Sequence, residues 1–529
     1  MNPFVGKTYA ESIAYIAERH GGRTALIFEG RHHTFADIKR EADAASRKLA
    51  ALGLQPGDTI ALWCPNRPEF AWVWLGASEM GLVTVILNTR LKREEFVYQI
   101  AQSDSRAVVV PGPGAFRDFL GELADVPPDR FPRLRHVIAL DSPGPDRPEA
   151  LDWTALPDDG PLPAMERDPG KPALIAYSSG TTAQPKGAVL SHCIWRKAYD
   201  GGTYLDLGPD ERLFLSVPLF GVLGCLNGLL TFWAHGASIV LEQRFEADSC
   251  IRALRDLRCT QIHLLPSMLD RLSAHPEFDP AAFPQLRGGV ILSSDPAVME
   301  RATRELDAPG FITGYGLTES TGLVARCRWD QPLAVRTACQ GWPLPDCHLR
   351  IVDPESGQDM PAGEPGEIWI GGYSVMLGYY NKPEETARAI TPDGWLRSGD
   401  MGYLREDGAV VFLRRLKDGY KHKGFNVSTP EVEAAIQQHP GVAAAAVVGV
   451  PDPEAGEIGV AYVMPTEDSD LDEADVLGFL KDRLSSFKLP AHVFVVESFP
   501  LTSGTGKVQK FKLREDAIGR LRREAPAAG

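Results

Sequence analysis

Short apolar runs alternate with helical patterns after about residue 171, and this alternation limits the fold more than any other feature. The runs are "ALIAY", "LFLSV", "ASIVL", "QIHLL", "GGVIL" and "FIT", separated by stretches such as "DSCIRALRDLRC" and "PAVMERATREL". Parallel strands need crossover segments, and both faces of their sheet must be covered. The order therefore predicts a doubly wound α/β sheet. Residues 1 to about 170 repeat the style, with a helix in "TFADIKREADAASRKLAALGL" and strands in "TIALWC" and "RAVVV", and we expect a second α/β layer there.

The last third of the chain has a different pattern. From about residue 346, "HLRIVDPESGQDMPAGEPGEIWIGG" contains short runs broken by glycine and proline, which is typical of antiparallel strands. Beyond "GAVVFLRRLKDGYKHKG" the sequence predicts a compact α+β unit. Its first helix covers "TPEVEAAIQQH", with Thr429 placed to cap it and Pro430 in the first turn. A chain of 529 residues exceeds the size of one core, and we place a domain boundary near 413, between 1–412 and 413–529.

Composition excludes some functions. The net charge of -15 provides no basic field for nucleic acid or for an anionic membrane surface. Residues 213–241 are almost free of charge and long enough to cross a bilayer, but Pro218, Asn227, His235 and several glycines interrupt them. We expect a buried strand, helix and strand there rather than a membrane span.

The cysteines and the amino terminus indicate a location. The eight cysteines are scattered and form no Cys-x-x-Cys pair, which is unlike a disulfide or zinc framework. They are interpreted as buried thiols in a reducing compartment. The first 22 residues mix charges with apolar positions and lack a signal-peptide pattern. A cytoplasmic protein is expected.

The stretch "YSSGTTAQPKGAVLSH", residues 177–192, follows a predicted strand and is rich in hydroxyl residues and glycine. Backbone N–H and side-chain O–H groups on such a loop converge on phosphate oxygens, and Lys186 adds a positive charge. The loop therefore predicts a polyphosphate site. It is not a Walker loop, because Pro185 and Gly187 flank the lysine. Taken alone, it is also compatible with a solvated turn.

Five motifs in order resemble the adenylate-forming superfamily, whose members include acyl-CoA synthetases, aryl-CoA ligases, the adenylation domains of peptide synthetases and firefly luciferase. The phosphate loop is followed by "TGYGLTES", "GWLRSGDMGYLREDG", "RRLKDGYKHKGFNVSTPEVE" and "TSGTGKVQK". The resemblance covers essentially the whole chain. It implies doubly wound α/β subdomains and a small distorted β-barrel in a large N-terminal domain, followed by a small mobile α+β C-terminal domain.

The resemblance also implies a first reaction, in which a carboxylate attacks the α-phosphate of ATP and forms an acyl-AMP. Catalysis of this meeting of two anions is mostly positioning and charge neutralisation. By resemblance, Glu319 binds Mg²⁺, Tyr315 and Gly316 lie at the adenine, Thr318 lies near the α-phosphate, and Lys507 contacts the reacting groups. The other residues implied are the phosphate-binding Ser178, Ser179, Gly180, Thr181, Thr182 and Lys186, and the ribose-binding Asp400 and Arg415. Without the other motifs, Glu319 would be interpreted as a surface cap and Tyr315 as an ordinary half-buried ring.

A second reaction is implied for the small domain, which in the family rotates after adenylation and brings a different face to the thiol of CoA. Lys417 matches the hinge position. Gly424 has no Cβ and would let backbone approach the pantetheine arm. Lys421, Lys423 and Asn426 are the other candidates for this thioester-forming arrangement.

Four departures from the family pattern concern specificity. Ala183 stands where the phosphate loop has glycine, and Arg414 stands where glycine or aspartate is usual. Gly221 replaces a histidine near the acid, and "SSDPAV" replaces a Gly-Gly-Ala-Pro stretch. The predicted acid pocket contains Phe220, Gly221, Ser294, Asp295 and Gly314. Loss of the ring at 221 favours bulky apolar acids, whereas Asp295 favours hydrogen-bonding ones, and the two alternatives stay open.

The leading interpretation is an ATP-dependent acid:CoA ligase for an aliphatic or aromatic acid, using ATP, Mg²⁺ and CoA. A free-standing chain without carrier or condensation modules favours it. The alternative is a stand-alone adenylating enzyme that loads a carrier-protein phosphopantetheine. A luciferase-like oxidative enzyme and a silent binding protein rank lower, since fold does not fix function. No nucleic-acid partner or membrane span is expected, and a homodimer is compatible with the sequence.

Overall fold

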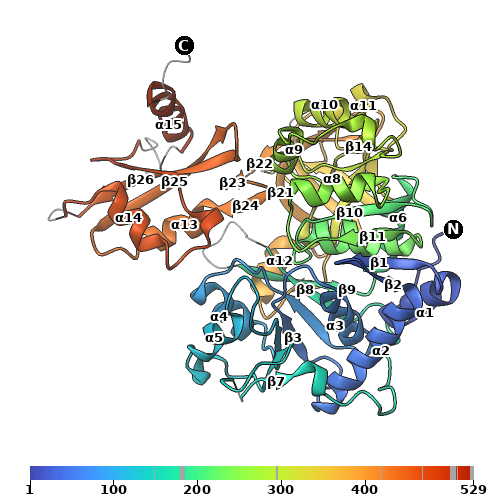
Figure 1. Ribbon diagram of the computed structural model, residues 1–529. Helices are drawn as coiled ribbons and strands as arrows, with labels where there is room; N and C mark the ends of the chain where they lie inside the picture. Colours follow the sequence, from blue (N-terminus) through green and yellow to red (C-terminus); the bar gives the residue numbers. More distant parts are fainter. Residues whose placement is uncertain are drawn as a thin grey trace. The chain divides into compact units, whose positions relative to one another are not determined.

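The chain is organised as two compact units (Figure 1). The first consists of residues 1–89, 97–178 and 187–414, and the second of residues 90–96, 179–186 and 415–529. The boundary near 413 remains a prediction. The computed structural model describes residues 1–147, 149–178, 185–293, 296–354, 356–416, 419–466, 469–500, 508 and 510–524.

One sheet of the large unit has the strand order β20-β9-β8-β4-β3-β5-β6-β7. Neighbouring strands from β8 to β7 along this order run parallel, as the alternating pattern predicts. The apolar strands β3 and β4 are buried along their whole length. The bounds are β3 Thr59–Leu62, β4 Val83–Ile86, β5 Ala107–Val110, β6 His136–Ala139, β7 Leu151–Asp152, β8 Pro172–Ser178, β9 Lys186–Ser191 and β20 Gly378–Tyr379.

A second sheet has the order β14-β13-β12-β10-β11-β1-β2. Its strands are parallel from β14 to β1, and β2 closes an antiparallel hairpin on β1. The bounds are β1 Thr24–Phe28, β2 Arg31–Thr34, β10 Arg212–Leu215, β11 Ser238–Leu241, β12 Gln261–Ile262, β13 Gly288–Val290 and β14 Gly310–Ile312.

The division of strands between these sheets corrects the sequence interpretation. The run "ALIAY" was grouped with the runs that follow it, but it forms β8 and pairs with β4 of the other sheet. Conversely, β1 comes from the first thirty residues and pairs with β11. Local periodicity identifies a strand but carries no information about its neighbour, and sequential strands pair or neighbour in only about two thirds of cases.

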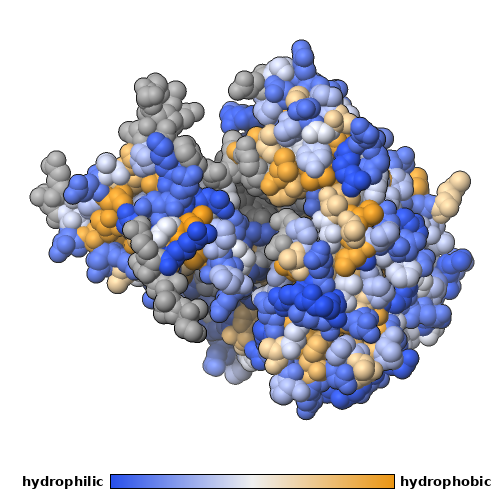
Figure 2. Space-filling model, turned by 90° about the horizontal axis from the view of Figure 1, so that it is seen from above, coloured by the Kyte–Doolittle hydropathy of each residue, from blue (hydrophilic) through white to orange (hydrophobic). Residues whose placement is uncertain are grey.

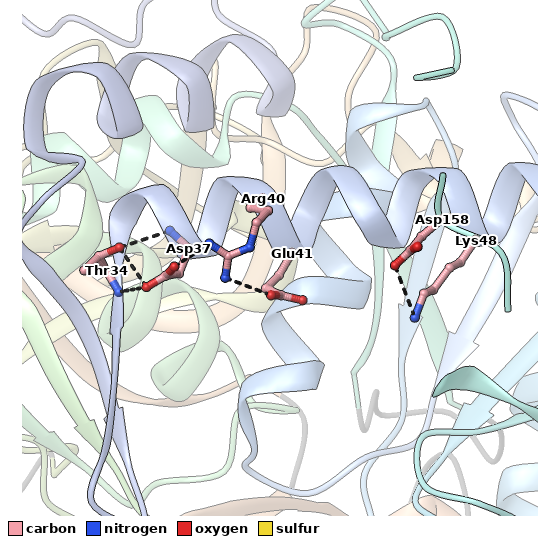
Figure 3. A network of polar contacts seen from close by, with 6 residues as sticks. All are labelled: Thr34, Asp37, Arg40, Glu41, Lys48 and Asp158. Atoms are coloured by element: carbon pink, nitrogen blue, oxygen red, sulfur yellow. Dashed lines mark hydrogen bonds and ion pairs between the residues drawn. The ribbon is translucent and has the colours of Figure 1, made fainter. Parts of the chain in front are cut away.

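Helices cover the sheets, and local signals explain where several of them begin (Figure 1). Thr34 and Asp37 form a capping box at the start of α2, in which each backbone N–H donates to the other side chain (Figure 3). The hydrogen bond from the Thr34 N–H and the one from the Arg40 guanidinium lower the pKa of Asp37 to about 2. The helices of the large unit are α1 Tyr9–His20, α2 Phe35–Ala51, α3 Pro68–Glu79, α5 Phe119–Ala124, α6 Ile194–Thr203, α7 Thr231–Ala234, α8 Ala247–Arg255, α9 Pro266–Ser273, α10 Pro296–Glu305, α11 Leu333–Ala338 and α12 Pro383–Ala389. A further helix, α4 Arg93–Gln102, has its first residues in segment 90–96 of the second unit and the rest in the large unit.

The apolar segment 213–241 is part of the hydrophobic core of the large unit. It contains most of β10, a π-helix at Leu223–Leu230, α7 and β11, and so confirms the expected strand, helix and strand. Across the described part of the chain, no helix combines the length and the apolar character that crossing a bilayer requires. The face of the molecule in Figure 2 is mainly hydrophilic, with apolar residues in small separate patches.

Antiparallel strands complete the large unit. A three-stranded sheet has the order β15-β16-β17, and a four-stranded sheet has the order β18-β19-β21-β22. The predicted short strands after residue 346 are confirmed as the antiparallel pair β18 and β19. The bounds are β15 Gly314–Leu317, β16 Gly322–Arg326, β17 Trp342–Pro343, β18 Cys347–Val352, β19 Gly366–Gly372, β21 Leu396–Leu404 and β22 Val410–Arg415.

The small unit is α+β, as expected. Its sheet has the order β24-β23-β26-β25, with β27 parallel to β26. The bounds are β23 Gly419–His422, β24 Phe425–Ser428, α13 Thr429–Ile436, β25 Val442–Asp452, β26 Gly456–Pro465, α14 Glu473–Leu480, β27 His492–Val495 and α15 Lys510–Glu524.

Two local predictions in the small unit have different outcomes. Thr429 was expected to cap α13, but it is the first helical residue, and Ser428 occupies the cap position without a side-chain bond. The Thr429 hydroxyl instead accepts a hydrogen bond from Lys510. Pro430 lies in the first turn, as predicted.

All eight cysteines of the chain are described and free, and all but Cys193 are buried, which confirms the buried thiols.

Candidate active site

The turn that carries Glu319 connects two antiparallel strands of the large unit. It is a 3₁₀ turn, Thr318–Ser320, between β15 and β16. Glu319 is half-buried; its Oε1 accepts a hydrogen bond of 3.0 Å from the Tyr379 hydroxyl, and its carbonyl accepts one from the Met376 N–H. A carboxylate held in this way fits Mg²⁺, which takes one or two protein carboxylates and completes its shell with phosphate oxygens and water. Groups of three or more metal-ligating side chains do not occur among the described residues, which is compatible with such a sparse site.

The two strands around this turn pack with little space between their backbones. A Cβ on Gly316 would lie 2.1 Å from the Gly322 carbonyl oxygen, and one on Gly314 would lie 2.5 Å from that of Ala325. Both positions therefore require glycine for packing. This gives a structural reason for the glycines of "GYGLTES" beside their predicted part in nucleotide and acid binding.

Tyr315 and Asp400, predicted at opposite ends of the nucleoside, lie together. The Tyr315 hydroxyl donates to Asp400 Oδ2 at 3.0 Å, and both side chains are buried. Phe412 stacks on the Tyr315 ring with centroids 6.3 Å apart. The tyrosine is therefore fixed on one face and at its hydroxyl, as a ring that stacks on a base would need to be. Arg415 lies at the end of β22, where the structure describes its backbone only.

The predicted acid-pocket loop comes close to the Glu319 turn. Gly322, just after this turn, lies so near Val222 that a Cβ on it would be 2.8 Å from Val222 Cγ1. Val222 directly follows Phe220 and Gly221. A Cβ on Gly221 would make only an ordinary contact of 3.4 Å with the Pro218 carbonyl oxygen. The structure thus brings together the loop of the expected acid pocket and the expected metal-binding turn, and leaves room at position 221.

The other predicted pocket residues follow neighbouring parallel strands. Gly314 comes shortly after β14, and Ser294 and Asp295 follow β13, although these two residues lie outside the described residues. The residues preceding them are in contact, because the Thr313 hydroxyl donates to the Ser293 carbonyl at 3.3 Å. Ligands bind at the carboxyl ends of parallel strands, so the arrangement suits a substrate site.

The predicted phosphate loop and the predicted catalytic Lys507 fall largely outside the described residues. β8 ends at Ser178 and β9 begins at Lys186, so the described strands frame the loop. Of Ser178 only the backbone is described. Besides Ser294 and Asp295, the predicted residues that lie wholly outside are Ser179, Gly180, Thr181, Thr182, Ala183, Lys417 and Lys507. Their roles remain predictions.

In the small unit, the predicted thiol-site residues form a tight hairpin between β23 and β24. Lys423 and Gly424 are its two turn residues, with φ of 47° and 84°, and His422 pairs with Phe425. Such a turn favours glycine, so the turn itself explains Gly424 in addition to its predicted closeness to CoA. Lys421 and Lys423 are exposed, and Asn426 is described by its backbone only.

Several residues that hold the site were missed from the sequence. Asn66 donates to the Val217 and Glu242 carbonyls and accepts from the Leu219 N–H, which fixes the approach to Phe220. His263 accepts from the Val290 N–H through Nδ1, and its Nε2 lies 3.1 Å from the Asn227 carbonyl oxygen. Burial lowers the pKa of His263 to about 4, so the ring is neutral and Nε2 donates. The sequence signal was a lone histidine in the apolar run "QIHLL".

The whole chain matches known sequences. The sequence model of the family described as AMP-binding enzyme matches residues 13–380, and that of the AMP-binding enzyme C-terminal domain matches residues 431–507. The feruloyl-CoA synthase of an Amycolatopsis species is 34% identical over 506 residues, covering 94% of this chain and 95% of the relative. A mitochondrial medium-chain acyl-CoA ligase of Rattus norvegicus is 29% identical over 546 residues, covering 97% and 88%.

Solved structures agree. The amide bond synthetase McbA of Marinactinospora thermotolerans has a TM-score of 0.83 at 29% identity, covering 96% of this chain and 99% of that one. The chain belongs to the AMP-binding enzyme family and has its fold, a large mixed α/β unit with a small C-terminal domain. It is an enzyme of the AMP-forming acyl-CoA synthetase class, which forms an acyl adenylate on the way to a CoA ester.

Proposed function

We propose that this acyl-CoA synthetase activates an aliphatic or aromatic carboxylic acid and passes the acyl group to CoA. In the first step a carboxylate oxygen attacks the α-phosphorus of ATP, the bond to the pyrophosphate breaks, and pyrophosphate leaves. In the second step the CoA sulfur attacks the acyl carbonyl, AMP leaves, and the thiol proton is released. The relatives named for feruloyl and medium-chain acyl groups support both acid types.

The observation that best supports this proposal is the close approach of Val222 to Gly322. This contact brings the loop with Phe220 and Gly221 next to the turn with Thr318 and Glu319. An acid bound at the loop would therefore present its carboxylate to phosphates bound at the turn. Glu319 would hold Mg²⁺, which supplies positive charge to the phosphates when bound. The pair Tyr315 and Asp400 would bind the nucleoside, and Arg415 would bind its ribose.

The remaining predicted residues complete the proposal. The phosphate loop, Ser178 to Thr182 with Lys186, would donate to the phosphates of ATP. Lys507 would neutralise charge where the two anions meet. A rotation at Lys417 would then bring Lys421, Lys423, Gly424 and Asn426 to the thiol. Cytoplasmic location follows from the cysteine interpretation and is part of this proposal.

A screen of short, medium, long-chain and aromatic acids tests the substrate class. Pyrophosphate release is measured with and without CoA, and the acyl product is identified by mass spectrometry with CoA, a phosphopantetheinylated carrier protein or an amine as the acceptor. We expect a CoA ester of one acid class. Acylation of the carrier without turnover of CoA would favour the alternative enzyme that loads carriers, and an amide product would favour the chemistry named for McbA.

Separating the two half-reactions tests the role of Lys507. Lys507→Ala should lower pyrophosphate release by about 10²–10³-fold, the usual cost of losing one charge-stabilising donor, and leave the conversion of supplied acyl-AMP to thioester near the wild-type rate. Lys512→Ala, which changes an exposed lysine on α15, is the matched control. Equal loss of both half-reactions in Lys507→Ala would contradict the assignment.

A further inference from the structure

A buried lysine holds the turn next to Glu319. Lys197 lies on α6, and its side chain is buried. Its Nζ donates hydrogen bonds to the carbonyl oxygens of Ser320 at 2.7 Å and Thr321 at 2.8 Å. These carbonyls belong to the two residues that directly follow Glu319. Among the described residues, the hydrogen bonds of Nζ thus go to the backbone of the turn and not to a side chain.

The residue between these two hydrogen bonds is strained. Thr321 has φ of 59° and ψ of 38°, the left-handed conformation, which a β-branched side chain rarely adopts. Such a conformation costs about 1–2 kcal/mol and persists only where neighbouring contacts enforce it. The Thr321 N–H donates to the Thr318 carbonyl, and its hydroxyl donates to the Ser374 carbonyl at 2.7 Å. Lys197 adds a bond on each side of the strained residue.

The surroundings of Lys197 do not favour a charge. Among the described residues, the ion pairs closer than 4 Å do not include Lys197. Burial lowers its pKa to about 7, and Arg326 acts in the same direction, whereas Cys347, Cys193 and Asp200 oppose the shift. The Asp200 carboxylate accepts from Asn2 and Tyr373. A methionine would fill a similar space but would leave the Ser320 and Thr321 carbonyls without this donor, so what the lysine supplies is the pair of hydrogen bonds to the turn.

We propose that Lys197 is a positioning residue for adenylation, which holds the strained turn so that Thr318 and Glu319 face ATP and its Mg²⁺. This inference rests on the proposed role of Glu319. Nζ keeps two N–H donors whether the amine is charged or neutral, so the positioning needs the hydrogen bonds and not the charge. Small displacements of groups that bind the reacting atoms cost up to about 10²-fold in rate, and this is the scale on which loss of Lys197 should act.

The test compares Lys197→Met with the wild type in each half-reaction. We expect kcat for pyrophosphate release to fall about 10- to 100-fold, with a higher Mg²⁺ concentration needed for half-maximal rate, while conversion of supplied acyl-AMP to thioester changes less than about 2-fold. Lys48→Met is the matched control. Lys48 is a partly buried lysine of the large unit, and its Nζ donates to the Trp153 carbonyl at 2.9 Å. The same Nζ lies 3.9 Å from Asp158 (Figure 3).

A second variant separates positioning from general damage. Thr321→Gly removes the cost of the left-handed conformation, so Lys197→Met should lower kcat less in a Thr321→Gly background than in the wild type. This comparison also serves if the single variant folds poorly, because the glycine should then restore folding together with activity. Equal losses in both backgrounds, an unchanged kcat, or equal loss of both half-reactions would overturn the inference. A wild type that releases no pyrophosphate with any acid would instead refute the proposed function.

Discussion

Among the residues that the structure describes, two lysines are buried, one in each unit, and their partners differ. Lys197 in the large unit bonds to two backbone carbonyls, and burial lowers its pKa to about 7. Lys488 in the small unit bonds to the carboxylates of Glu431 and Glu95, each at 2.7 Å. The segment 90–96, which contains Glu95, belongs to this unit. Burial alone would lower the pKa of Lys488, but Coulombic attraction to Glu431 and Glu95 outweighs it and raises the pKa.

The difference indicates two uses of a buried lysine. Each buried charge is unfavourable by itself, and a lysine between two carboxylates pairs with both of them. Its removal therefore leaves buried anions unpaired. Between carbonyls a lysine gains less energy, and what it fixes is the path of the backbone. We therefore expect Lys488 to act mainly on stability and Lys197 mainly on activity.

The largest expected effect is that of Lys488→Met. Breaking a buried ion pair by removing one partner costs about 3–5 kcal/mol, and Glu431 and Glu95 would then repel each other. Hydrogen exchange followed by mass spectrometry should show this loss in the amides of β25 and β26, because local free energies of opening are read from exchange. Lys488→Met combined with Glu431→Gln should recover part of the loss. A loss of less than about 1 kcal/mol would place Lys488 in the same category as Lys197.

A second prediction uses the opposite pKa shifts of the two lysines. The folded pKa of Lys197 is about 7, below its ordinary value of 10.5. Between these two pH values the unfolded chain binds the proton and the folded chain does not. Stability from this group therefore rises with pH between 7 and 10.5, by at most about 1.4 kcal/mol per pH unit. The folded pKa of Lys488 is raised, so its contribution is present below 10.5 and is lost as pH rises through the folded pKa.

Exchange measurements at pH 7, 8 and 9 check this contrast, after correction for the intrinsic pH dependence of exchange. The difference in opening free energy between wild type and Lys197→Met should change with pH in peptides of α6 and β16, in favour of the wild type. The corresponding difference for Lys488→Met should stay constant over this range. Parallel behaviour of the two variants would mean that the carbonyl-bound lysine keeps its full charge.

The smallest expected effect concerns Tyr379, which, like Lys197, donates a hydrogen bond to the Glu319 turn. Tyr379→Phe removes the hydroxyl that donates to Glu319 Oε1. A hydrogen bond to a charged group is worth about 1.5 kcal/mol at the low end, which corresponds to about 10-fold in rate, so pyrophosphate release should slow by about 10-fold, with stability changed by less than about 0.5 kcal/mol. Tyr380→Phe is the control, because its hydroxyl lies 3.4 Å from Asp104 instead. A larger change in stability than in rate would contradict the positioning role of this contact.

Much of the fold and part of the site could be predicted from the sequence. The short apolar runs became strands, and the motif with Glu319 became a turn beside the predicted acid loop. Tyr315 and Asp400 were both predicted at the nucleoside, and the structure joins them by a hydrogen bond. The sheet that contains "ALIAY" and the cap of α13 were predicted wrongly, because strand neighbours and the exact first residue of a helix depend on contacts outside the local window.

The residues that hold the site gave weaker signals. Asn66, His263 and Tyr379 contact partners far along the chain, such as Val217, Asn227 and Glu319. Each is a single polar residue in an ordinary context, and one sequence does not distinguish it from a residue satisfied by its neighbours. Only the fold shows that the partners belong to the loops of the candidate site.

The amino-acid sequence by itself determined the kinds of secondary structure, the two-part organisation and the order of the family motifs, because hydrophobic periodicity and turn chemistry act over a few residues. The tertiary structure alone decided which groups meet. Lys197 looks like any lysine on an amphipathic helix, and its two carbonyl partners lie more than 120 positions away. Because α6 packs against the strained turn, Lys197 becomes part of the candidate site. A buried donor needs acceptors, and these come from the fold that surrounds it.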